Sequence, residues 1–237
     1  MLFRSLKTDY LWKQVLAKDS LANIIESYAQ VVEEEEVDAG GKKRKKRKQI
    51  FPRFHQLRTV RALLRRAHAD GVGNRYLIQH SAGSGKSNTI AWLAHRLSSL
   101  HDAADKKVFD SVIVVTDRQV LDAQLQDTIY QFEHKQGVVQ KIDEDTRQLA
   151  QALAGGTPIV ITTLQKFPFI TETLDKLRKE NHPGIAIDTQ DKQFAVIVDE
   201  AHSSQSGETA GELRGILNKS GIEAAIAAEF LDWEEDD

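Results

Sequence analysis

The sequence predicts an α/β fold in which a mostly parallel β-sheet is flanked by helices. Three apolar runs have the β-branched content of buried strands: Val112–Val115, Ile159–Ile161 and Phe194–Val198. Segments with helical spacing of apolar residues separate these runs, and such alternation is typical of crossovers between parallel strands. Polar residues follow each run, at the edge of the sheet where ligands bind in folds of this class.

Residues 1–49 are expected to form a helical lead-in and a charged linker. Apolar residues recur at near-helical spacing from Tyr10 to Val32. Asp19 and Ser20 lie within this span and could cap a second helix there. The acidic run Glu33–Glu36 and the basic run Lys42–Lys48 then flank two glycines, which predicts an exposed linker. The seven cations of the basic run could instead contact a DNA backbone, and the sequence leaves both interpretations open.

The next helix is expected over Arg58–Ala69, before the glycine-containing turn Asp70–Gly73. Gln56 lies at the start of this helix. Its side-chain amide has one donor group and one acceptor, which is the pattern needed to pair with an adenine edge. Gln56 is therefore a candidate nucleotide contact.

A glycine-rich turn joins the apolar run Tyr76–Ile78 to a helix that ends near Leu100. In such a turn, backbone N–H groups and the helix N-terminus can hold phosphate oxygens. Lys86 can reach the β- and γ-phosphates, and the Ser87 hydroxyl can ligate Mg²⁺. The usual pattern is G-x-x-x-x-G-K-[ST], and His80 occupies the first glycine position here. The candidate nucleotide-binding residues of the turn are Ser81, Ala82, Gly83, Ser84, Gly85, Lys86 and Ser87.

Further helices are expected over Val120–Phe132 and Thr146–Leu153, with a short strand at Val138–Ile142 between them. The strand Phe194–Val198 then delivers two adjacent carboxylates, Asp199 and Glu200, at its carboxyl end.

Those two carboxylates complete a set of groups that can transfer a phosphoryl group from ATP. Asp199 is expected to hold Mg²⁺, mainly through a water molecule, and Glu200 to orient or deprotonate the attacking water. Lys86, Asp199 and Glu200 are the predicted catalytic residues. His202 could transmit the state of the nucleotide to a partner domain or be a polar residue at a helix start.

Composition excludes several other classes of function. The 237 residues include no cysteine, which rules out disulfides and thiolate chemistry. The net charge is −3, no apolar run approaches the roughly 18 residues of a membrane span, and the start of the chain lacks the features of a signal peptide. The histidines form no consistent metal-ligand cluster by spacing. A cytoplasmic protein is expected.

The motifs resemble those of superfamily 2 helicases and translocases, and more narrowly the restriction (R) subunit of type I restriction-modification enzymes. Asp199–His202 has the Asp-Glu-Ala-His form found among these motors, and His80 is usual in the narrower group. The stretches that carry the resemblance are Phe51–Gln56, Ile78–Ser87, Val114–Arg118, Leu121–Gln124 and Val198–Gly207.

The resemblance implies a RecA-like P-loop NTPase domain over about 50–228, followed by an acidic tail over 229–237. It implies that ATP and Mg²⁺ are bound, with Gln56 on the adenine. It also implies work on double-stranded DNA together with methylation and specificity subunits. The residues expected to face DNA are Thr116, Arg118, Thr162 and Thr163.

The chain departs from the family pattern at both ends. The family's nuclease domain lies before the motor, and a Thr-x-Thr-Pro-like motif and a second RecA-like lobe with the arginine finger lie after it. We therefore expect a fragment that is inactive alone. Two alternatives remain: a non-catalytic module that binds DNA or a partner, and a lobe of another superfamily 2 motor.

Overall fold

The computed structural model describes residues 8–37, 41–81, 83–116, 122–133, 137–142, 146–163, 192–199 and 224–233, the last of these through the backbone alone. The chain divides into two compact units, Met1–Arg53 and Phe54–Asp237. No helix in the described ranges combines the length and the hydropathy needed to cross a membrane.

The first unit contains two short helices and a β-hairpin. A π-helical turn, η1 (Leu11–Val15), precedes α1 (Lys18–Ser27), and β1 (Gln30–Val37) pairs antiparallel with β2 (Lys43–Ile50). The helix expected to continue to Val32 therefore ends at Ser27. The β-branched pair Val31 and Val32 favours the extended conformation that the hairpin uses.

The expectation of a charged linker is wrong, because the acidic run and the basic run form the two strands of this hairpin. Glu33 lies opposite Arg47, and Glu34 lies opposite Lys46. The Arg47 Nε donates a hydrogen bond to Glu33 Oε1 at 3.1 Å. Like charges repel one another within each run, whereas the opposite charges of the two runs attract across the strands. Several cations of the basic run are therefore paired within the hairpin, which weakens its interpretation as a DNA-binding surface.

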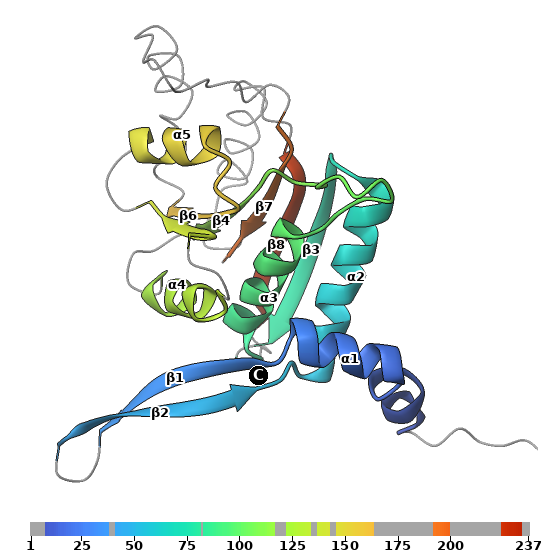
Figure 1. The fold of residues 1–237 in the computed structure, drawn as a ribbon, viewed down its shortest axis with the longest axis vertical. Helices are drawn as coiled ribbons and strands as arrows, with labels where there is room; N and C mark the ends of the chain where they lie inside the picture. Colours follow the sequence, from blue (N-terminus) through green and yellow to red (C-terminus); the bar gives the residue numbers. More distant parts are fainter. Residues whose placement is uncertain are drawn as a thin grey trace, which may run out of the picture. The chain divides into compact units, whose positions relative to one another are not determined.

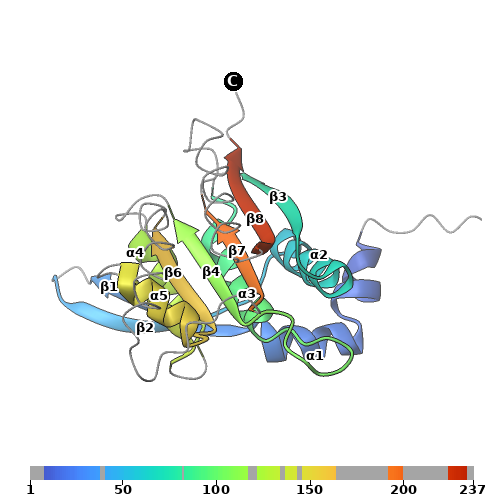
Figure 2. The ribbon, with the colours of Figure 1, turned by 90° about the horizontal axis from the view of Figure 1, so that it is seen from above.

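The second unit contains a six-stranded sheet in which all neighbouring strands are parallel (Figures 1 and 2). Its strands are β3 (Asn74–Ser81), β4 (Ser111–Thr116), β5 (Val139–Lys141), β6 (Ile159–Thr163), β7 (Phe194–Val198) and β8 (Ala224–Trp233). Their order across the sheet is β3-β8-β7-β4-β6-β5. The helices among its described residues are α2 (Phe54–Asp70), α3 (Lys86–Ser98), α4 (Asp122–Gln131) and α5 (Thr146–Ala154). The predicted α/β class and the predicted strands are confirmed.

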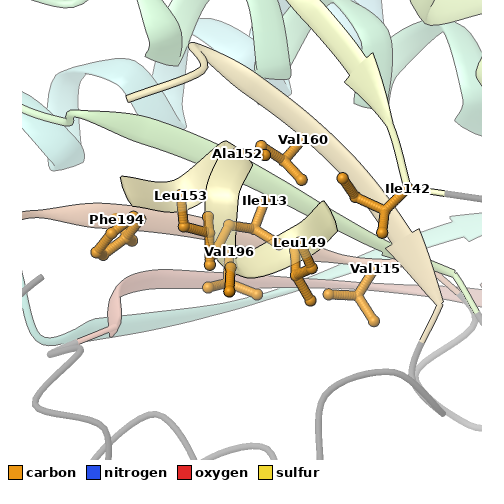
Figure 3. Close-up of a cluster of buried hydrophobic side chains, with 10 residues drawn as sticks. Ile113, Val115, Ile142, Leu149, Ala152, Leu153, Val160, Phe194 and Val196 are labelled. Atoms are coloured by element: carbon orange, nitrogen blue, oxygen red, sulfur yellow. The ribbon is translucent and has the colours of Figure 1, made fainter. Parts of the chain in front are cut away.

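Helices cover both faces of the sheet, with α5 on one side of β4 and β6 and α4 on the other (Figure 1). Alternate residues of β4, β6 and β7 face α5 and form a buried apolar cluster (Figure 3). Fully buried members include Ile113 on β4, Val160 on β6 and Val196 on β7, with Leu149 and Leu153 on α5. This core holds the carboxyl ends of the central strands in fixed positions.

Strand β8 corrects the expected end of the domain. It spans Ala224–Trp233 and lies between β3 and β7, so it passes through the boundary at residue 228 and into the expected acidic tail. Its register places Ala227 beside Arg75 on one side and Val196 on the other. The alanine-rich sequence carries no strand signal of its own, because alanine favours helices. Pairing on both sides accounts for the strand.

Candidate functional site

The glycine-rich turn connects the last residue of β3, Ser81, to the first residue of α3, Lys86. The backbone N–H of Ser84 donates to the Ser81 carbonyl at 3.1 Å, which closes the turn. Gly83 and Gly85 have φ angles of +71° and +85°, in the left-handed region that glycine adopts without strain. The turn therefore has the backbone shape that brings a helix N-terminus to the carboxyl edge of the sheet.

Lys86 and Asp199 meet at this edge although they lie far apart in the sequence. The Lys86 Nζ lies 3.1 Å from Asp199 Oδ1, and their side chains are only 12% and 17% exposed. Asp199 follows β7, and its backbone N–H donates to the Val115 carbonyl on β4 at 2.9 Å. The structure thus brings together two of the three predicted catalytic residues. The third, Glu200, lies outside the described residues.

Gln56 is buried in the first turn of α2, and its amide is turned toward the glycine-rich turn. The side-chain Nε2 donates to the Gly85 carbonyl at 2.9 Å and to the Ser84 carbonyl at 3.4 Å. A Cβ atom at Gly85 would lie 2.6 Å from Gln56 Nε2. In this conformation Gln56 supports the turn, while its predicted contact with adenine stays a prediction.

Two histidines also contact the turn, and neither contact follows from the spacing of residues in the sequence. His80 Nδ1 lies 2.7 Å from Ser84 Oγ, and His55 Nε2 lies 3.1 Å from the Ser84 carbonyl oxygen. The sequence does indicate that His80 faces inward, because it lies two residues after Ile78 on β3 and alternate residues of a strand share a face. Ile78 and His80 are both buried.

Ser87 lies in the first turn of α3 and is half-buried. Its hydroxyl and the Asp199 carboxylate are the oxygen ligands that Mg²⁺ prefers. Among the described residues no group of three or more histidine, aspartate or glutamate side chains is arranged to hold a metal ion. Ala82, Arg118 and His202 lie outside the described ranges.

The threonines expected to face DNA lie together at the carboxyl edge, but their side chains are buried. Thr116 on β4 pairs with Thr163 on β6, and Thr162 pairs with Val115. The exposed fractions are 4% for Thr116, 1% for Thr162 and 7% for Thr163. Little of these residues is accessible in the described structure, and their contact with DNA stays a prediction.

Comparison with known proteins gives matches to an ATPase family and to two restriction enzyme subunits. Residues 55–224 match the SWI2/SNF2 ATPase family. The chain is 32% identical over 139 residues to a Mycoplasma pneumoniae protein named as the C-terminal part of a type I restriction enzyme endonuclease subunit. It is 33% identical over 137 residues to the type I restriction enzyme HindI endonuclease subunit of Haemophilus influenzae. These matches cover 57% and 55% of this chain.

The chain spans less than two thirds of either relative, with 60% of the first and 11% of the second covered. Among solved structures, a DEAD box protein from Methanococcus jannaschii matches with a TM-score of 0.50 and 19% identity, over 78% of this chain and 45% of that chain. This likeness concerns the fold alone and agrees with a RecA-like domain. The family match spans most of the second unit and includes Lys86 and Asp199. The chain belongs to the SWI2/SNF2 ATPase family.

Proposed function

We propose that this chain is the ATP-binding motor lobe of a type I restriction enzyme R subunit, an ATP-dependent helicase-like hydrolase that moves DNA. The observation that carries the proposal is the shielded Lys86–Asp199 ion pair beside the glycine-rich turn. The likeness to two type I restriction enzyme endonuclease subunits supports the narrower assignment.

The ion pair has the charges that a magnesium–nucleotide complex requires, held next to each other. A lysine cation faces the place for phosphate, and a carboxylate faces the place for Mg²⁺. Each charge compensates the other in a site where an isolated charge would be costly. Binding of Mg-ATP would separate the pair, because the phosphates attract Lys86 and the metal attracts Asp199.

The remaining groups of the turn would complete the site. Backbone N–H groups of Gly83–Gly85 and the N-terminus of α3 would hold phosphate oxygens, and Ser87 with Asp199 would hold Mg²⁺. Bound Mg²⁺ supplies positive charge that stabilises the transferring phosphoryl group. Glu200 is assigned to the attacking water, and His202 to coupling with a partner domain.

The proposed partners are double-stranded DNA, the methylation and specificity subunits of a restriction complex, and a second RecA-like lobe. The proposed location is the cytoplasm. These assignments rest on the likeness to the restriction enzyme subunits and on the resemblance of the motifs.

Calorimetric titration of the chain with Mg-ATP tests the nucleotide site. We expect saturable binding that Lys86→Ala weakens at least about 100-fold, because a lysine–phosphate contact is a strong charge-assisted bond. The matched control is Lys107→Ala, since Lys107 is exposed and lies between the end of α3 and the start of β4. Equal affinity of wild type and Lys86→Ala would contradict the proposal.

A second titration tests DNA as a partner. Binding of a fluorescent duplex is measured at increasing salt, for the wild type and for a variant in which Lys45, Lys46 and Arg47 are replaced by glutamine. If the motor lobe holds DNA through the second unit, the variant keeps most of the affinity and its salt dependence. Loss of nearly all binding in the variant would favour the non-catalytic module that acts through the basic run.

A further inference from the structure

Ser84, in the middle of the glycine-rich turn, is held at each of its three polar atoms. Its N–H donates to the Ser81 carbonyl at 3.1 Å. Its carbonyl oxygen lies 3.1 Å from His55 Nε2, and its hydroxyl lies 2.7 Å from His80 Nδ1. The first bond is local to the turn. The other two come from side chains on α2 and β3, which belong to different parts of the fold.

The chemistry of these atoms defines part of the hydrogen bonding. A carbonyl oxygen only accepts, so His55 must donate to Ser84 through a protonated Nε2. The Ser84 hydroxyl can donate to His80 Nδ1 or accept from it, and either choice fixes the rotamer of Ser84. Both contacts have the lengths of well-formed hydrogen bonds.

The two histidines also contact each other. Their ring centroids are 5.9 Å apart, and the rings are inclined at 68°, which is the edge-to-face arrangement that aromatic rings favour. His80 is only 4% exposed, whereas His55 is an exposed residue. The buried ring therefore supports the exposed one, and both converge on one residue of the turn.

We propose that His80 and His55 form a clamp on Ser84 that holds the glycine-rich turn in the shape that accepts nucleotide phosphates. The inference rests on the proposed function, since it assigns positioning residues to the same site. A turn with two glycines at positive φ has many conformations available when unrestrained. Because Ser84 is fixed before phosphate binds, less conformational entropy is lost when the phosphate binds.

The clamp also gives a physical role to the position where the general phosphate-loop pattern has glycine. A glycine there would leave the Ser84 hydroxyl without this neighbour from β3. With histidine at this position, a side chain of β3 contacts the turn that follows the strand.

A double-mutant cycle on His80 and Ser84 tests the clamp, with affinity for a fluorescent Mg-ATP analogue as the first readout. We expect His80→Ala and Ser84→Ala each to weaken binding about 3- to 10-fold, the usual range for one hydrogen bond. The double variant should bind Mg-ATP only slightly less tightly than the single variant of lower affinity, because both changes remove the same contact. His101→Ala is the control, since His101 is exposed and its ring bonds to the carbonyl of nearby Ser99.

Rescue distinguishes positioning from packing. His80→Asn places an amide nitrogen close to where Nδ1 lies, and it should restore affinity to within about twofold of wild type. His80→Gly matches the general pattern but offers no side chain, and we expect it to behave like His80→Ala. A thermal melt identifies any variant that does not fold.

Hydrogen exchange of residues 79–88 without nucleotide gives a readout that does not depend on ATP. His80→Ala should speed exchange in this segment, and His80→Asn should slow it again. Losses of affinity that simply add in the double variant, or exchange that His80→Ala leaves unchanged, would each overturn the clamp. If wild type binds no Mg-ATP but exchange responds as expected, the proposed function fails while the clamp stands.

Discussion

Lys86 Nζ and Asp199 Oδ1 are 3.1 Å apart, and water reaches little of either side chain. Removing one member of such a pair leaves an uncompensated charge in a poorly hydrated place, which costs more than removing both. The pair therefore links the stability of the second unit to the chemistry of its site.

The first prediction concerns this pair. Lys86→Ala should lower the free energy of unfolding by about 1–3 kcal/mol, because Asp199 keeps its charge without its partner. Adding Asp199→Ala to that variant should recover part of the loss. Urea unfolding followed by circular dichroism measures both effects, with Lys107→Ala as the control expected within about 0.5 kcal/mol of wild type. Strictly additive losses in the double variant would contradict the coupling.

The second prediction compares two glycines of similar backbone shape. Gly85 and Gly73 have φ angles of +85° and +95°, so alanine at either position should cost about 1–2 kcal/mol of stability. Only at Gly85 would the new Cβ meet a side chain, 2.6 Å from Gln56 Nε2, whereas nothing lies within 4 Å at Gly73. Gly85→Ala should therefore also weaken Mg-ATP binding, on the order of tenfold.

Urea unfolding of the two variants measures the cost of backbone strain, and calorimetry measures the effect of displacing Gln56 on Mg-ATP binding. If Gly73→Ala weakens nucleotide binding as much as Gly85→Ala does, the contact between Gln56 and the turn is not what matters.

The third prediction concerns the hairpin. Hydrogen bonds from Arg47 and then from Lys45 lower the pKa of Glu33 below its usual 4.5. A carboxyl whose pKa is lowered by folding stabilises the folded state above its unfolded pKa. That contribution is lost as the pH falls through the folded pKa. Carboxyl NMR titration should place the midpoint of Glu33 below 4.5, and Arg47→Ala should raise it.

Salt provides the control for the hairpin, because exposed charges are screened at high ionic strength. At 1 M NaCl, where the screening length is about 3 Å, the midpoint of Glu33 should move back toward its usual value. A midpoint at or above 4.5 at low salt would argue against the cross-strand pairs.

The fourth prediction concerns β8. Proline at Ala227 removes a backbone N–H from a strand that has neighbours on both sides, and the cost should be roughly 2–4 kcal/mol. Ala227→Gly keeps the N–H and should cost less, about 0.5–1 kcal/mol. Urea unfolding of the two variants makes the comparison. Equal and small effects would mean that this segment does not lie inside the sheet.

Elements with local sequence signals could be predicted from the amino acids alone. Apolar β-branched runs predicted β4, β6 and β7, since two buried faces require apolar residues at consecutive positions. The glycines and Lys86 predicted a phosphate-binding turn, because backbone freedom and a cation are properties of adjacent residues. By spacing alone, His80 departs from that pattern, because it stands at the position of the first glycine.

Contacts between residues that are distant in the sequence became visible in the folded chain. The hairpin depends on the register that sets Glu33 opposite Arg47, and β8 depends on partners on both sides. The ion pair of Lys86 with Asp199 depends on the order of the strands across the sheet, and the contact of His80 with Ser84 depends on the path of the turn. The physical reason is that pairing energy belongs to two segments together, so neither segment shows it when it is considered alone.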